Sequence, residues 1–193
     1  MSQVKLEIGK YYHIFNRRNN KELIFLNEDN YNYFLSLVSK YLLPISDMYS
    51  YCLIPNHFHF VIKIKTENEL PQGFDVSKLH QPFSNLFNAY SKAFNKRNNR
   101  RGSLFQEHLK RIEIKNSDYL RNLIVYVNTN SNHHELGDYK IYKHCSFLSL
   151  ISDNETRLAR KQVVDLFDDV KNLKFMFESK KEKLDTIKEF TFE

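Results

Sequence analysis

Apolar and polar positions along the chain follow two different periods. Where apolar residues recur every three or four positions, the spacing predicts an amphipathic helix, and where they alternate with polar residues it predicts a strand. The helical spacing covers residues 28–43, 82–99 and a segment starting at 117, and it continues with many charges over 157–188. The strand-like spacing covers residues 11–16, 45–54, 57–65 and 109–115.

Pro55 and Asn56 separate two of these strand-like runs. Proline fixes one backbone angle and asparagine tolerates left-handed geometry, so the pair predicts the turn of a hairpin. In the run that follows, His57 and His59 fall on one face of the strand, and Phe58 falls on the other.

The predicted order is strand, helix, two strands, helix, strand, helix. This order favours an α+β fold with a mainly antiparallel sheet and helices packed on one side. Residues 66–81 hold Pro, Gly and scattered charge, which predicts a long loop. We expect a main domain over residues 1–150 and a C-terminal helical extension over residues 151–193.

Composition excludes several classes of protein. With 193 residues, only 4 Gly and 4 Pro, and 15% aromatic residues, the chain suits a packed domain and not a collagen or a disordered tail. No segment approaches the roughly 18 apolar residues of a membrane span, and residues 1–10 lack the apolar run of a signal peptide. Cys52 and Cys145 are too few for a disulfide framework, so we expect a reducing cytoplasm.

The net charge of +6 has a local origin. Residues 92–121 contain nine Lys and Arg against three Asp and Glu, an excess equal to that of the whole chain. With Tyr90, Phe94 and Phe105 interleaved, this run suits the phosphates and bases of single-stranded nucleic acid, although a solvated helix face has the same pattern. The candidate DNA-contacting residues are Arg97, Arg100, Arg101, Lys110 and Arg111.

Two histidines and a tyrosine are the candidates for chemistry. On a strand, His57 and His59 project from the same face with Cα atoms about 6.5–7 Å apart, so both imidazoles can bind one metal ion. Two histidines on a half-exposed sheet face would give the same pattern. A tyrosine on an apolar helix, such as Tyr126, is most often a core residue. Asn130 lies four positions later on the same helix and therefore on the same face as Tyr126. If that helix lies beside the histidine strand, Asn130 could supply a third metal ligand.

The segment from Tyr51 to Phe60, YCLIPNHFHF, resembles the histidine-hydrophobic-histidine signature of the HUH single-tyrosine transposases, especially the REP-associated tyrosine transposases. The resemblance continues in ordered blocks over about residues 10–150. These blocks are Tyr12 to Ile14, Arg17, Phe94-Asn95, Gly102 to Gln106, Lys110-Arg111, Asp118 to Leu120 and Tyr126 to Asn130.

The resemblance implies a ferredoxin-like or RRM-like HUH fold and a DNA transposase that cleaves and rejoins single-stranded, hairpin-bearing DNA. His57 and His59 match the metal-binding histidines of the family, and Tyr126 matches its catalytic tyrosine. Asn130 matches the polar position that can complete the metal site. The implied metal is Mg²⁺ or Mn²⁺, and the implied intermediate is a 5′-phosphotyrosine.

The chain departs from the family pattern at two places. Asn130-Ser131 stands where Asn-Pro is usual, and residues 144–147, His-Cys-Ser-Phe, stand where Trp-Ser-Ser-Tyr is usual. A second hypothesis is therefore a catalytically silent, domesticated module of the same fold that binds single-stranded DNA or RNA. A third, a zinc hydrolase, lacks a nearby acidic base and a third His or Cys ligand at zinc spacing. The choice between monomer and homodimer stays open.

Overall fold

A four-stranded sheet forms the centre of the computed structural model, which describes residues 4–18, 22–107 and 109–180. The strands are β1 (Tyr11–Arg17), β2 (Ser46–Ile54), β3 (His57–Ile64) and β4 (Lys110–Ile114). Their order in the sheet is β2-β3-β1-β4, and every neighbouring pair is antiparallel. The predicted strands are confirmed, each to within one residue at either end.

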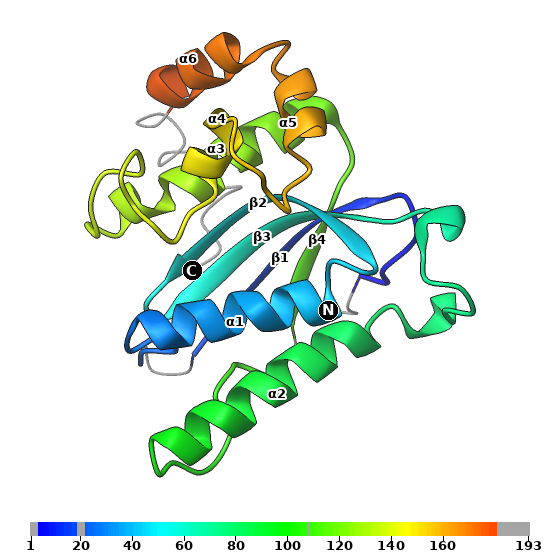
Figure 1. Cartoon of the computed structure of the whole chain (residues 1–193), viewed down its shortest axis with the longest axis vertical. Coiled ribbons are helices and arrows are strands. Elements are labelled where there is room, and N and C mark those ends of the chain that lie inside the picture. The colour runs from blue at the N-terminus through cyan, green and yellow to red at the C-terminus, as the bar shows by residue number, and fades with distance from the viewer. Residues whose placement is uncertain (1–3, 19–21, 108, 181–193) are drawn as a thin grey trace.

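Helices cover both faces of this sheet (Figure 1). One face carries α1 (Glu28–Tyr41) and α2 (Gln81–Arg97). The other face carries α3 (Ser117–His133), α4 (Phe147–Ile151) and α5 (Arg160–Leu166), and α6 (Val170–Lys180) packs on α3 farther from the sheet. The α+β class and the antiparallel sheet are confirmed, whereas the prediction that the helices pack on one side is wrong. The predicted loop contains two short 3₁₀ helices, η2 (Glu67–Glu69) and η3 (Val76–Lys78).

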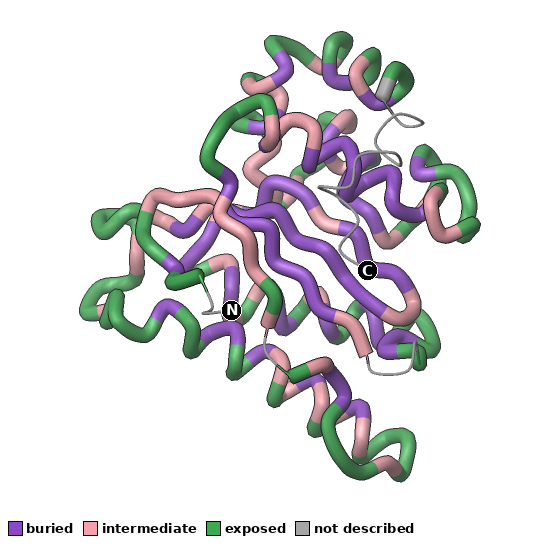
Figure 2. The backbone as a smooth tube through the Cα atoms, turned by 180° about the vertical axis from the view of Figure 1, so that it is seen from behind, coloured by how far each residue is buried: buried purple, intermediate pink, exposed green. Residues whose placement is uncertain are grey.

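Apolar residues on both faces of the sheet explain the second layer of helices. On β3, Phe58 and Phe60 pack with Phe34 of α1 in a first core. Val61 of the same strand points the other way and packs with Leu123 of α3 in a second core. On this second face Val61 is joined by Tyr49, Cys52 and Ile54 of β2. A sheet that is apolar on both faces needs cover on both sides. Figure 2 shows the inner strands buried over most of their length.

Asparagine side chains fix where two of the helices begin. Asn27 Oδ1 accepts a hydrogen bond from Asn30 N at 3.2 Å and caps α1. Asn116 Oδ1 accepts one from Tyr119 N at 2.7 Å and caps α3. Such caps satisfy backbone N–H groups that have no partner within the first turn. Because a helix rises about 1.5 Å per residue, the cap of α3 also sets how far along the sheet Tyr126 lies.

The chain that follows α3 lies along the outer edge of β2. Leu53 N donates to His144 O at 2.8 Å, and Ala159 N donates to Met48 O at 2.8 Å. Helices α5 and α6 then contribute to the second core through Val163, Phe167, Leu173 and Phe177. The division into residues 1–150 and 151–193 stays a prediction, and positions 181–188 of the predicted charged helix lie outside the described residues.

Two further observations concern thiols and membranes. Cys52 and Cys145 are both buried free thiols. Within the described ranges, no helix combines the length and the apolar character needed to cross a membrane.

Candidate active site

His57 and His59 open β3 and lie on the sheet face that α3 covers. Their ring centroids are 5.1 Å apart with the planes at 86°, and both side chains are buried. Pairing between β1 and β3 places Arg17 opposite His57 and Phe15 opposite His59. One end of the sheet therefore presents two nearly perpendicular imidazoles toward a helix.

Helix α3 brings Tyr126 and Asn130 to the same place. The ring centroid of Tyr126 lies 6.1 Å from that of His59, and Asn130 Oδ1 lies 3.3 Å from His57 Nε2. Tyr126 keeps 8% exposure, whereas Asn130 has none. Residues four apart share a helix face, and the fold sets this face of α3 against the histidine pair.

Hydrogen bonding indicates which nitrogen of His57 carries the proton. Nδ1 lies 2.7 Å from Asn56 Oδ1, and an amide oxygen only accepts, so Nδ1–H is the donor. A neutral imidazole has a single N–H, which leaves a lone pair on Nε2 facing Asn130 Oδ1. The amide of Asn130 lies within reach of this lone pair, with Oδ1 3.3 Å from Nε2. In the described part of the chain, Asn130 Nδ2 has no hydrogen-bond partner.

Burial keeps the imidazoles of the site neutral. Desolvation lowers the pKa of His57 to about 4, and the charge of His134 is the next cause. Desolvation also lowers the pKa of His59 well below its ordinary value. His13 of β1 is buried as well, and desolvation lowers its pKa to about 3. His13 Nε2 lies 2.9 Å from His59 Nδ1, and a hydrogen bond of this kind orients a metal-binding imidazole.

This set of donors fits a divalent cation. Among the described residues, no three His, Cys, Asp or Glu side chains are grouped as metal ligands. The oxygen donor beside the histidines is the amide oxygen of Asn130, 3.3 Å from His57 Nε2. Imidazole nitrogens suit Mn²⁺, and an amide oxygen suits both Mn²⁺ and Mg²⁺. The residues that fit are His57, His59 and Asn130.

Two histidines at the end of α3 also border the site, although no sequence signal assigned them to it. The ring centroid of His134 lies 4.6 Å from that of His57, and the ring of His133 stacks against Tyr126 at 5.6 Å. His134 follows Asn130 by four positions, so helical spacing was the signal that could have found it.

Lys110 is the predicted DNA-contacting residue that the fold places beside the histidines. It lines a small hollow together with Arg17, His57 and His59. Its Nζ lies 5.8 Å from the centroid of the Phe15 ring. Arg17, which the sequence marked only as part of the family resemblance, joins Lys110 as a second positive group at this end of the sheet.

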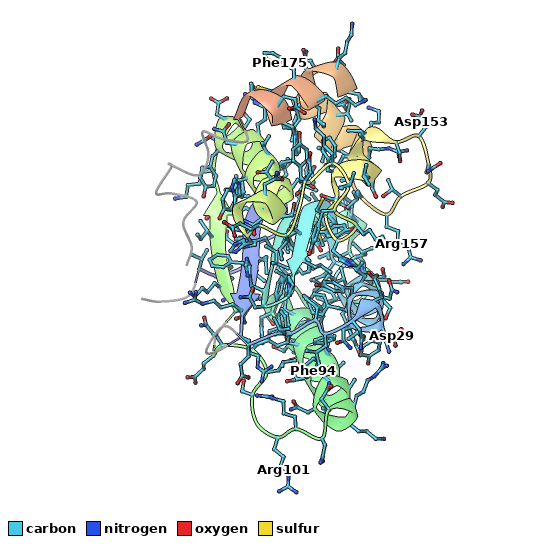
Figure 3. All side chains as sticks on the ribbon, turned by 90° about the vertical axis from the view of Figure 1, so that its left-hand side faces the viewer. Asp29, Phe94, Arg101, Asp153, Arg157 and Phe175 are labelled. Carbon is cyan, nitrogen blue, oxygen red and sulfur yellow. The ribbon has the colours of Figure 1, made fainter. Side chains whose placement is uncertain are left out.

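The other four predicted DNA-contacting residues lie away from the histidines. Arg111 belongs to β4, but its side chain lines hollows beside α2, on the opposite face of the sheet. Arg97 ends α2 and is paired with Asp29 of α1 at 2.8 Å. Arg100 and Arg101 follow α2, and Figure 3 shows Arg101 pointing outward at the far end of the molecule from α6.

The structure thus sets the His57 and His59 pair of an open antiparallel sheet against the helix that carries Tyr126. No family model and no curated protein matches the sequence. Among solved structures, a REP-associated tyrosine transposase bound to a REP hairpin is similar, with a TM-score of 0.56 and 16% identity over 79% of this chain and 87% of that chain. The resemblance to the REP-associated tyrosine transposases is therefore confirmed at the level of the fold.

Proposed function

We propose that this protein is a DNA transposase of the HUH tyrosine type, a nuclease and strand transferase acting on single-stranded, hairpin-bearing DNA. The observation that carries the proposal is the meeting of Tyr126 and Asn130 of α3 with His57 and His59 of β3. The similar transposase was solved with a REP hairpin, which supports a DNA hairpin as the class of ligand.

Tyr126 is the proposed nucleophile. After it loses its proton, the phenolate oxygen attacks the phosphorus of the scissile phosphodiester in line. A bond forms between Tyr126 Oη and phosphorus, the bond from phosphorus to the 3′ oxygen breaks, and that oxygen takes up a proton. The result is a 5′-phosphotyrosine and a free 3′-hydroxyl. Attack of a 3′-hydroxyl on the phosphotyrosine reverses these changes, so rejoining needs no nucleotide cofactor.

His57, His59 and Asn130 are the proposed ligands of a Mg²⁺ or Mn²⁺ ion. When bound, such an ion would polarise a non-bridging phosphate oxygen and offset the charge of the transition state. The contact of His57 Nδ1 with Asn56 Oδ1 at 2.7 Å supports this role, because an N–H at Nδ1 leaves the lone pair of a neutral His57 on Nε2. Lys110 borders the same hollow and supplies a fixed positive charge for the phosphate.

The DNA is proposed to be single-stranded where it meets Tyr126. A flexible backbone can bend toward a buried pair of histidines, whereas a paired duplex is stiff. The proposed phosphate contacts outside the hollow are Arg97, Arg100, Arg101 and Arg111.

A covalent-adduct assay tests the proposal. Labelled single-stranded hairpin DNA is incubated with the protein and Mg²⁺ or Mn²⁺, and adducts are resolved on a denaturing gel. We expect an adduct with the wild-type chain and none with Tyr126→Phe or His57→Ala. Tyr119→Phe, which changes another tyrosine on α3, is the matched control and should keep the adduct.

The other outcomes point to the other hypotheses. Tight DNA binding without an adduct under either metal would contradict the transposase and favour the silent binding module. Hydrolysis that persists in Tyr126→Phe would favour a metal-dependent hydrolase.

A further inference from the structure

A second hollow lies between α2 and β4, on the sheet face opposite the histidines. Its volume is about 390 Å³, which falls within the roughly 300–1,000 Å³ range of small-molecule sites. Its lining combines aromatic, amide and cationic side chains, among them Phe83, Phe87, Phe105, Asn88, Gln106 and Arg111. We call it the α2–β4 groove.

One wall of the groove consists of aromatic rings, and these rings pack on the first core. Phe87 and Phe105 meet with centroids 5.0 Å apart, and Phe87 also stacks on the buried Phe58 at 5.6 Å. Phe87 is only half-buried, so part of its side chain stays accessible from the groove. An accessible, fixed aromatic ring is a surface on which an unpaired nucleobase stacks.

The charge of the groove is positive. A smaller hollow of about 160 Å³ continues it, because both are lined by His80 and Arg111, and the smaller one adds Lys5. None of the described residues that line the two hollows is acidic. By contrast, Glu155 lines the larger hollow of about 480 Å³ beside α1. The α2–β4 groove therefore suits an anionic ligand with an aromatic part.

The groove adjoins the candidate active site around one end of the sheet. Asn16, near the end of β1, lines both the α2–β4 groove and the hollow of the histidines. Two hydrogen bonds hold this corner: Asn16 Nδ2 donates to Gln106 O at 3.3 Å, and Gln106 N donates to Arg17 O at 2.9 Å. A single DNA strand that passes from the histidines along Arg17 can bend around Asn16 and enter the α2–β4 groove.

We propose that the α2–β4 groove binds one unpaired nucleotide of the single-stranded DNA, with its base against Phe87 and its phosphate beside Arg111. This inference rests on the proposed function for its choice of DNA, and it adds a binding position away from the reacting phosphate. It makes the groove the element that sets which nucleotide of the strand reaches Tyr126.

Fluorescence of 2-aminopurine tests the groove without any turnover. The probe is a single-stranded oligonucleotide of about ten nucleotides, a length within the site sizes of single-strand binders, with one 2-aminopurine moved along it. Binding is measured in EDTA, so the result does not depend on cleavage. Stacking on the groove should quench the probe at one position of the strand.

Two variants and a matched control test whether DNA binds in the groove or elsewhere on α2. Ser84 is exposed and lines the groove, so Ser84→Trp should fill it and weaken binding about tenfold, the value of one lost base stack. Phe87→Leu keeps an apolar side chain and should lose the quenching. Asn85→Trp places the same bulk on the next, exposed position outside the groove and should bind like the wild type.

The results also distinguish this inference from the proposed function. If Ser84→Trp and Asn85→Trp bind and quench alike, the groove proposal is overturned, even when Tyr126 forms its adduct. If wild-type Tyr126 forms no adduct but quenching is lost only in Ser84→Trp and Phe87→Leu, the groove stands and the transposase does not. Absence of any position-specific quenching in the wild type overturns the groove.

Discussion

Asn128 is a buried polar residue between Tyr126 and Asn130 whose loss should loosen α3 from the sheet. Its Nδ2 donates to Ser50 Oγ of β2 at 2.8 Å and to Ile124 O at 2.9 Å. Its Oδ1 accepts from Ser146 Oγ at 2.7 Å. Asn128, Ser50 and Ser146 have no exposure to solvent, so no water replaces a lost partner. We therefore predict that Asn128→Ala is strongly destabilising.

The magnitude follows from these contacts. Each of the two hydrogen bonds to other segments contributes about 1 kcal/mol net, and the hydroxyls left buried without this partner add about 1 kcal/mol more. The expected loss of unfolding free energy is about 3 kcal/mol. Because Asn128 and Ser146 contact each other directly, a double-mutant cycle with Ser146→Ala should give a coupling energy of about 1 kcal/mol.

Urea unfolding followed by circular dichroism measures these values. Asn32→Ala, at an exposed asparagine on α1, is the matched control and should change the unfolding free energy by less than about 0.5 kcal/mol. A loss below about 0.5 kcal/mol in Asn128→Ala, or a coupling energy near zero, would refute the reasoning that this network fixes α3 to the sheet.

Three further predictions follow from individual contacts. Ser131 Oγ is buried with no hydrogen-bond partner among the described residues, so Ser131→Ala should raise the unfolding free energy in urea by about 1 kcal/mol. Tyr90 OH donates to Ile24 O at 2.6 Å in the first core, so Tyr90→Phe should lower the melting temperature through a loss of about 1 kcal/mol or more. His13→Leu removes the hydrogen bond to His59 and should weaken Mn²⁺ binding in calorimetry at least about tenfold; unchanged affinity would contradict the role given to His13.

Local sequence signals were sufficient for most of the secondary structure. The hairpin of β2 and β3 follows from Pro55 and Asn56 between two β-rich runs, and pairing of these strands begins directly beside that turn, at Ile54 and His57. Helix α1 begins at the predicted residue, where Asn27 caps it, and ends two residues before the predicted end, ahead of Pro44. These signals lie within a few residues of the structure they specify, so a single sequence contains them.

The sequence did not show that helices cover both faces of the sheet. A period of two shows that β3 has two faces, but it does not show that both faces are covered. Cover on the second face depends on α3, whose Leu123 belongs to the same core as Val61 of β3, a residue far away along the chain. The segment from His144 to Ala159 holds only the five-residue helix α4 and two short pairings with the edge of β2, each too brief to leave a periodic pattern.

For the candidate site, too, the local spacing could be predicted from the sequence, but the packing could not. The spacing of His57 with His59, and of Tyr126 with Asn130, follows from the geometry of a strand and a helix. Whether the two pairs meet depends on the packing of α3 on the sheet, which the sequence does not encode locally. His13 belongs to a block of the family resemblance, but nothing in the sequence assigned it to the site, because its contact with His59 arises from the pairing of β1 with β3.

The basic stretch shows how folding changes the meaning of a sequence pattern. Residues 92–121 look like one continuous positive surface, but the chain carries them past both faces of the sheet. Arg97 is offset by Asp29, and Arg121 forms an ion pair with Asp118, so these charges attract DNA less than their number suggests. Lys110 lies beside the histidines, and its neighbour on β4 turns to the opposite face. Under the proposed function, the positive groups nearest the scissile phosphate would be Lys110 and Arg17, because both line the hollow of the histidines.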